Sequence, residues 1–492
     1  MHGRLEMARK AQTRARSWWR DLFKAQRWDA ARTNPADRGV WARADLLAID
    51  TALNAQTRAA IRRRARYVVA NNAYAAGAAQ ALVNATVGAA PRLQLTSARL
   101  DAETLTEIEA DFAEWAEAVS LPEKLRALRF ARFVDGEAFA VMYSNDRLTT
   151  SSGVTLDLRP LDCDRVAGGL ADANPDQVDG ITLDRYGDPV AYRILDQHPG
   201  ALGGVDIGAA REYPAGVVCH WFKKLYPEQH RGISELAPCL ELFNLIDRYS
   251  KAVVQASETA ADLAMVFTTD AVADAAYDVT EPPAPATGQP PFVQIPWARG
   301  MTMTVPEGWQ AKQITAEQPS NSYGMLVDEV LSQIGAAISV PKLLMKNSAE
   351  NYNYSSARVD LQQFQIAVKL DRQSMTHAIL YPLWRAWFAE YRLAKQVTET
   401  PRAVWYYDGF FHVDPLKEAN AAAVRLSTNT SSLAAEYGAR GMDWEQELRE
   451  IAREKAVIKQ LEEEFGVSMA TPATVASTGG GGDSDDRNRN DR

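Results

Sequence analysis

Hydrophobic residues recur three or four positions apart in several stretches of this chain, the spacing of amphipathic helices. In the Ala-rich segment 57–87, Ile61 and Ala65 fall near one face, with a run of arginines mostly on the other. Asn71-Asn72 interrupts this pattern, and a second helix is expected to end at Gly88. Further helices are expected at 101–119, 235–263, 321–338 and 357–392 and in a last set from Asp414 to about Phe465.

From about 133 to 222 the hydrophobic period falls towards two, which predicts strands. The expected strands are 139–143, 154–159, 180–184, 190–194 and 217–222. The Pro-rich segment 281–291 is incompatible with a helix or a central strand. It indicates a small module inserted between two helices. The pattern as a whole predicts an α+β fold.

The segment Ile338–Arg358 is the most distinctive stretch. Val340-Pro341 predicts a helix end, because the residue before proline is pushed out of the helical region. A polar, Asn- and Tyr-rich loop follows, and Ser355 or Ser356 is expected to cap a second, long helix. Pro382 should kink or break that helix. The sequence thus predicts one polar loop held between two helices.

Composition sets limits on function. The 492 residues suggest about three domains, and the net charge of −9 argues against a generally basic nucleic-acid binder. The three widely spaced cysteines favour buried thiols over a disulfide framework or zinc ribbon. No apolar run is long enough to span a bilayer and no secretory signal is evident, so we expect a soluble protein made in a reducing compartment.

Residues 1–32 form a basic arm with nine Lys and Arg residues against three acidic ones, and it carries Trp18, Trp19, Phe23 and Trp28. Such an arm could bind nucleic acid, an anionic surface or a partner protein, or be a solvated arm that orders only on assembly. The Gly-rich and Asp-rich residues 471–492 are expected to be a disordered tail.

No common catalytic motif is present, including the P-loop, the nucleophile elbow and the zinc-protease motif. A hydrolase would have to assemble Cys163, His220 and either Asp162 or Asp164, and nothing in the sequence brings them together. The acidic residues of 157–179 fit no calcium loop and are expected to be solvated loop carboxylates. We therefore expect no enzyme activity, no cofactor and no metal.

Four pieces of the chain, in fixed order, resemble the lambda-type family of tailed-phage portal proteins. They are Tyr67–Val87, Val217–Pro238, Ile338–Arg358 and Phe411–Lys417. The resemblance implies a homo-oligomeric ring, usually a dodecamer, at the capsid vertex of the virion. Double-stranded DNA would pass through it during packaging and ejection. The implied partners are the terminase large subunit, the major capsid or scaffold protein and a head–tail adaptor, with no membrane.

The resemblance also implies a portal-like subunit: a mixed α/β wing, two stem helices flanking a small α/β clip, a long kinked wing helix and a helical crown. In this sequence the parts would be the arm 1–32, wing 33–234, stem helix 235–263, clip 264–319, stem helix 320–340, tunnel loop 341–357, wing helix and return strand 358–410, and crown 411–470. The Pro-rich clip departs from the usual family pattern.

Three groups of site residues follow from this assignment. Stem acids, which would face the channel or else belong to a solvated helix face, suit a conduit that must not grip phosphates. The clip aromatics would dock partners or else pack the module's own core. The groups are the tunnel-loop residues Lys346, Asn347, Ser348, Asn351, Tyr352 and Asn353; the stem acids Glu241, Asp247 and Glu258; and the clip aromatics Phe292, Trp297 and Trp309. The alternatives are another virion structural protein, such as a minor capsid or head-closure protein, or an α+β hydrolase.

Overall fold

The computed structural model describes residues 46–167, 176–201, 210–262, 266–269, 309–312, 321–350, 352–410 and 415–467, together with positions 39, 42 and 44. The chain divides into two compact units, Met1–Thr57 and Arg58–Arg492. In the first unit the described helix is α3 (Ile49–Ala52), and α4 (Ala55–Asn71) begins there. All other described elements belong to the second unit.

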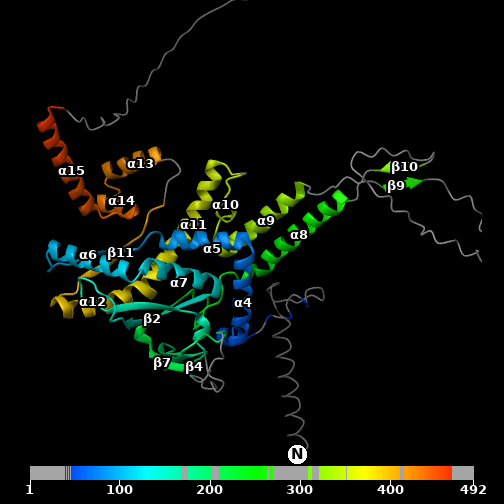
Figure 1. Ribbon diagram of the computed structural model, residues 1–492, viewed down its shortest axis with the longest axis horizontal. Helices are drawn as coiled ribbons and strands as arrows, with labels where there is room; N and C mark the ends of the chain where they lie inside the picture. The colour runs from blue at the N-terminus through cyan, green and yellow to red at the C-terminus, as the bar shows by residue number, and fades with distance from the viewer. Residues whose placement is uncertain are drawn as a thin grey trace, which may run out of the picture. The chain divides into compact units, whose positions relative to one another are not determined.

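The helices alternate with strands in the first half of the second unit and dominate its second half (Figure 1). The α-helices after α4 are α5 (Ala73–Val87), α6 (Ala102–Ala118), α7 (Leu121–Asp135), α8 (Leu240–Asp262), α9 (Asn321–Ile338), α10 (Lys342–Lys346), α11 (Tyr354–Met375), α12 (Tyr381–Lys395), α13 (Pro415–Ser427), α14 (Leu433–Ala439) and α15 (Trp444–Phe465). The predicted boundaries of the helices at 101–119 and 321–338 are confirmed to within a residue.

All strand pairs in the described part of the chain are antiparallel. The sheets have the orders β3-β2-β8, β4-β5-β6-β7, β1-β11 and β9-β10. The strands are β1 (Arg92–Thr96), β2 (Glu137–Ser144), β3 (Leu156–Leu161), β4 (Gln177–Val178), β5 (Ile181–Leu183), β6 (Pro189–Leu195), β7 (Ala210–Pro214), β8 (Val218–Phe222), β9 (Val266–Thr269), β10 (Trp309–Lys312) and β11 (Arg402–Tyr406). All five predicted strands are confirmed, whereas β1, β4, β7, β9 and β10 were not predicted.

Local signals account for the helix ends. Asn72 caps α5, its side chain accepting from the amides of Tyr74 and Ala75 at 3.0 and 3.2 Å, and Gly88 ends that helix at φ 65°. Gly136, at φ 94°, joins α7 to β2. A Cβ at this position would overlap the backbone of Ile233, so only glycine fits there.

The core is rich in aromatic residues. Phe112 and Trp115 of α6 pack against Trp384 and Trp387 of α12, with ring centroids 5.1–6.2 Å apart, and Trp405 of β11 completes the group. Burial of such rings is a large apolar contribution to folding. This cluster packs β1, β11 and α12, the second half of the long helix, against α6.

The long helix is interrupted as predicted, but by a different local structure. Residues Thr376–Leu380 form a π-helical turn, and Pro382 then lies in the first turn of α12, where a missing amide costs no helical hydrogen bond. The first stem helix also differs from expectation. It begins at Leu240, after the 3₁₀ turn Ala237–Cys239 that contains Pro238, and not at Glu235.

Candidate functional site

Helices α8 and α9 run side by side (Figure 1). Their contact includes Tyr249 and Tyr323, whose rings stack at 5.6 Å, and a 2.9 Å hydrogen bond between the hydroxyls of Ser250 and Tyr323. Phe243 and Ile246 of α8 are buried in the same cluster as Leu331 and Ile334 of α9. The two helices predicted as a stem therefore do pair.

A sharp turn follows α9. Ser339 has φ 58°, and the Val340 amide donates to the Gly335 carbonyl at 3.2 Å. A Cβ on Gly335 would lie 2.6 Å from the Val340 carbonyl oxygen, so this close return requires glycine. The predicted helix end at Val340-Pro341 is confirmed, and Pro341 occupies the N-cap position of the next helix without a side-chain capping bond.

The segment expected to be a polar loop from 341 to 357 is partly helical, because the apolar residues after Pro341 form α10. Met345 is buried, and α10 packs on α5 so closely that a Cβ on Gly77 would lie 2.8 Å from the Met345 carbonyl oxygen. The loop proper is thus residues 347–353. The sequence pattern did not predict α10, because five residues are too few to show a helical period.

Lys346 lies at the C-terminus of α10 and pairs with Asp328 of α9, with Nζ and Oδ1 2.8 Å apart. Lys342 approaches the other oxygen of Asp328 at 3.6 Å. The hydrogen bond from Lys346 lowers the pKa of Asp328, and the same bond raises the pKa of Lys346. Two lysines thus share one carboxylate in this subunit.

The remaining tunnel-loop residues have distinct roles. Asn347 ends α10 in the left-handed conformation at φ 48°, and the Ser348 amide donates to the Leu343 carbonyl at 3.2 Å. The Tyr352 hydroxyl donates to Asp360 at 3.1 Å, and burial together with this bond raises the pKa of Tyr352 to about 12. Asn353 caps α11 in a capping box with Ser356, so the expectation that Ser355 or Ser356 is the cap was wrong.

The stem acids and clip residues are less fully defined. Glu241 and Glu258 are exposed, and Asp247 is half-buried and pairs with Lys251 at 2.6 Å. Trp309 begins β10, which pairs with β9 in the region expected to be the clip. Asn351, Phe292 and Trp297 lie outside the described residues, as does the Trp309 side chain.

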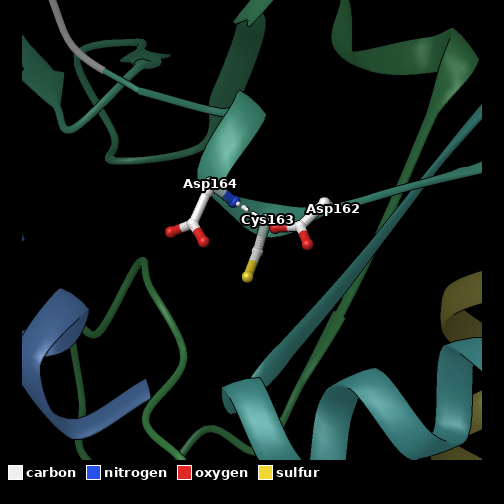
Figure 2. A group of neighbouring side chains, drawn as sticks. All are labelled: Asp162, Cys163 and Asp164. Atoms are coloured by element: carbon white, nitrogen blue, oxygen red, sulfur yellow. Dashed lines mark hydrogen bonds between the residues drawn. The ribbon is translucent and has the colours of Figure 1, made fainter. Parts of the chain in front are cut away.

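Asp162, Cys163 and Asp164 form a group whose ligand atoms lie within 4.8 Å of one another. Figure 2 shows the thiol between the two carboxylates on one short turn, where the Asp164 amide donates to Asp162 at 2.8 Å. His198 Nε2 lies 3.7 and 3.6 Å from the two carboxylates. Such a set of groups resembles the ligands of a transition metal.

In the structure, arginine side chains of α4 bind this group of residues. Arg66 reaches Asp162 at 3.0 Å, Asp164 at 2.9 Å and the Cys163 sulfur at 3.7 Å, and Arg62 pairs with Asp164. A cation would meet two guanidinium groups here, so the geometry favours ion pairs over a metal ion. The expectation that these aspartates are solvated loop carboxylates was wrong, since they bind arginines of α4.

The hydrolase arrangement is not formed in the described part of the chain. Burial raises the pKa of the Cys163 thiol, which disfavours the thiolate that a nucleophile needs. The His220 ring stacks on Phe139 at 4.2 Å, and its Nε2 lies 3.4 Å from Glu137. Burial lowers the pKa of His220.

The sequence reasoning missed Glu137, a fully buried carboxylate at the start of β2. It pairs with Arg62 at 3.0 Å and with Arg231 at 2.6 Å, and it accepts from the Gly232 amide at 2.9 Å. Burial would raise the pKa of Glu137, but Arg231 and His220 hold it well below its usual range. One signal was available: Glu137 is a lone acid in an apolar strand, a position that requires a cationic partner.

Residues 40–372 match the family model described as phage portal protein, lambda family. A probable portal protein of Halomonas phage phiHAP-1 is 23% identical over 299 residues, which cover 57% of this chain and 55% of that protein. This chain thus spans about half the length of the curated relative.

Among solved structures, the neck of an empty gene transfer agent particle, computed with C6 symmetry, matches at 17% identity and a TM-score of 0.44. The match covers 76% of this chain and 87% of that chain. The neck of the native particle, computed with C12 symmetry, matches at 16% identity and a TM-score of 0.43, covering 79% and 93%. On the strength of the family match, the chain belongs to the lambda family of phage portal proteins.

Among the helices of the described ranges, none combines the length and the apolar character that crossing a bilayer requires.

Proposed function

We propose that this chain is the subunit of a portal ring at a capsid vertex and that double-stranded DNA passes through the ring during packaging and ejection. One observation carries the proposal: the family match runs from 40 to 372 and includes α8, α9, α10 and Lys346. A twelve-subunit ring of 54.2-kDa chains would have a mass of about 650 kDa. The role is structural and not catalytic.

The geometry around Lys346 supports a channel that holds DNA weakly. In each subunit Lys342 and Lys346 share the carboxylate of Asp328, so one of the two lysine charges is neutralised within the subunit. Every phosphate that a protein neutralises adds to affinity and to its salt dependence, and a conduit with many free cations would retain its cargo. A lysine already paired with an acid can exchange partners with a passing phosphate at small cost.

Within this proposal, residues 341–357 form the tunnel segment, in which α10 leads into the loop 347–353. We place Lys346, Asn347, Ser348, Asn351, Tyr352 and Asn353 at the narrowest part of the channel. Glu241, Asp247 and Glu258 face the channel along α8. Residues 264–319 form a clip that docks the terminase large subunit and a head–tail adaptor through Phe292, Trp297 and Trp309. The major capsid or scaffold protein is the remaining proposed partner.

The test of the ring is direct. Negative-stain images of the purified full chain should show rotationally symmetric rings with a central hole, and light scattering should give a mass of about 600 kDa or more. Well-populated monomers at micromolar concentration, with no rings under any assembly condition, would contradict the proposal.

The clip assignment has its own test. A variant that lacks Pro282–Pro291 should assemble into capsids but fail to recruit the packaging motor or to join a tail. Deletion of a stretch of equal length from the tail 471–492 is the control. Normal packaging and completion in the clip variant would show that this module does not dock partners.

A further inference from the structure

A groove of about 1270 Å³ runs between β1 and α6 on one side and the start of α15 on the other. It is larger than the pockets of roughly 300–1000 Å³ that hold small molecules, and its size suits a peptide segment. Gln94 of β1 donates to Asp443 at 2.9 Å, and Gly441 lies against Tyr407 and Asp408, so both walls belong to packed structure.

The floor of the groove is apolar. Phe112 is buried beneath it, and half-buried side chains of Leu93, Leu100, Leu105 and Trp444 line it. Half-buried leucines and an indole leave apolar surface in contact with water, which favours covering by another apolar group.

The rim of the groove is acidic. Seven carboxylates line it against three arginines. Of the arginines, Arg92 lies 3.8 Å from Asp408, and Arg449 lies 3.6 Å from Glu445. The acidic set is Glu109, Glu117, Glu123, Asp443, Glu445, Glu447 and Glu450. A basic segment is therefore the electrostatic complement of this groove.

The pKa of Glu109 reflects burial and the negative charge of the groove. The Leu95 amide donates to it at 2.5 Å, and burial, with the charges of Asp443 and Glu445, raises its pKa to about 7. A cationic side chain placed over the groove would relieve this repulsion.

We propose that the groove receives the basic, aromatic arm of a neighbouring copy of this chain. Residues 1–32 carry nine Lys and Arg residues against three acids, and Trp18, Trp19, Phe23 and Trp28 supply apolar anchors for the floor. The arm combines the two properties that complement the groove: positive charge for its acidic rim and bulky apolar groups for its apolar floor. Docked in this way, each arm links two subunits and stabilises the assembly. The inference rests on the proposed homo-oligomer.

Cysteine cross-linking in the full chain tests the contact, because Cys163, Cys219 and Cys239 are all buried. One preparation carries Gln26→Cys in the arm, and a second, with a different tag, carries Ala113→Cys at the exposed edge of the groove. The two are mixed, assembled and oxidised. We expect covalent dimers that carry both tags. The matched control pairs Gln26→Cys with Val190→Cys, an exposed position on β6, and should give few dimers.

Charge reversal separates specific docking from chance collision. Glu117→Lys with Glu450→Lys, both exposed in the groove, should slow mixed-tag cross-linking roughly tenfold, since each reversed charge turns a weak attraction into repulsion. Glu463→Lys with Glu464→Lys makes the same charge change on α15 outside the groove and should leave the rate unchanged.

Three outcomes would overturn the inference while leaving the ring intact. In the first, rings form but the mixed-tag dimers do not exceed the Val190→Cys control. In the second, both charge-reversal pairs abolish cross-linking equally. In the third, the arm is protected from trypsin only by added double-stranded DNA, which would assign it to nucleic acid. Failure to form rings at all would instead count against the proposed function.

Discussion

Glu137→Gln is the sharpest perturbation of the fold, because it keeps the shape of a fully buried side chain and removes its charge. The carboxylate accepts from Arg231 Nη2 at 2.6 Å and Nε at 2.9 Å, from Arg62 Nη2 at 3.0 Å and from the Gly232 amide at 2.9 Å. The amide of glutamine cannot accept from all of these donors, and part of it would face them with its own hydrogens.

Removing one partner of a buried ion pair costs about 3–5 kcal/mol, since it leaves an uncompensated buried charge. Both arginines retain other acceptors: Arg62 keeps Asp164, and Arg231 keeps the Val166 carbonyl at 3.1 Å and Asp179. We therefore expect the lower end, about 3 kcal/mol. The matched control is Glu399→Gln, which breaks an exposed pair with Arg99 at 2.7 Å and should cost less than about 1 kcal/mol.

Denaturant unfolding of the unassembled chain measures the loss of unfolding free energy in the Glu137→Gln and Glu399→Gln variants. Hydrogen exchange in β2 and β8 shows whether the stability loss of Glu137→Gln is located in these strands. The pH dependence checks the cause. Because the folded pKa of Glu137 lies well below the usual 4.5, its stabilisation is full above pH 4.5 and declines as the pH falls below that value. Equal costs for the two variants, or a wild-type advantage that is unchanged from pH 7 to pH 3, would refute the reasoning.

Three further predictions concern the channel, the groove and a turn. Lys346→Ala should leave rings intact and alter DNA retention or translocation, whereas Lys224→Ala on an exposed loop should alter neither; loss of assembly would contradict the assigned role. The free energy of unfolding of Glu109→Gln should exceed that of the parent only slightly at pH 5 and by about 1–2 kcal/mol at pH 8. The raised pKa of about 7 makes ionisation costly in the folded chain, and partial exposure reduces the effect. A gain at pH 5 equal to that at pH 8 would exclude this cause. Gly136→Ala should abolish soluble folded protein, because its φ of 94° and an opposing backbone segment exclude a Cβ. Gly216→Ala is the control and should be tolerated, because the space around Gly216 is open. A normal yield of the Gly136→Ala variant would show that this turn can relax.

The sequence determined features that depend on neighbours along the chain. The periods of 3.6 and 2 located the stem-like helices and the strands of the first sheets, because amphipathic burial imposes those spacings. Pro341 marked the end of α9, and Asn72 and Gly88 marked the limits of α5, since these residues act through their own backbone preferences. The fixed order of four short motifs was enough to indicate the portal family, which the family match then confirmed.

The sequence alone did not predict features that are short or that depend on distant parts of the chain. β1 is five residues long and is stabilised by pairing with β11, some three hundred positions away, so its own residues carry a weak signal. The helical character of α10 depends on its contact with α5. The geometry of one turn determines that Asn353, and not a neighbouring serine, is the cap of α11.

Only the tertiary structure decided where the charges lie. In the sequence, the arginines of α4 and the aspartates of 157–179 are two separate polar runs, each typical of a solvated surface. In the folded chain, Arg62 forms ion pairs with both Glu137 and Asp164. This pairing of charges from distant elements offsets the desolvation cost of burying them. Periodicity records which face of a helix is apolar, but the partner of a buried charge is set by the packing of whole elements. That is why the candidate metal ligands Asp162 and Asp164 are arginine partners.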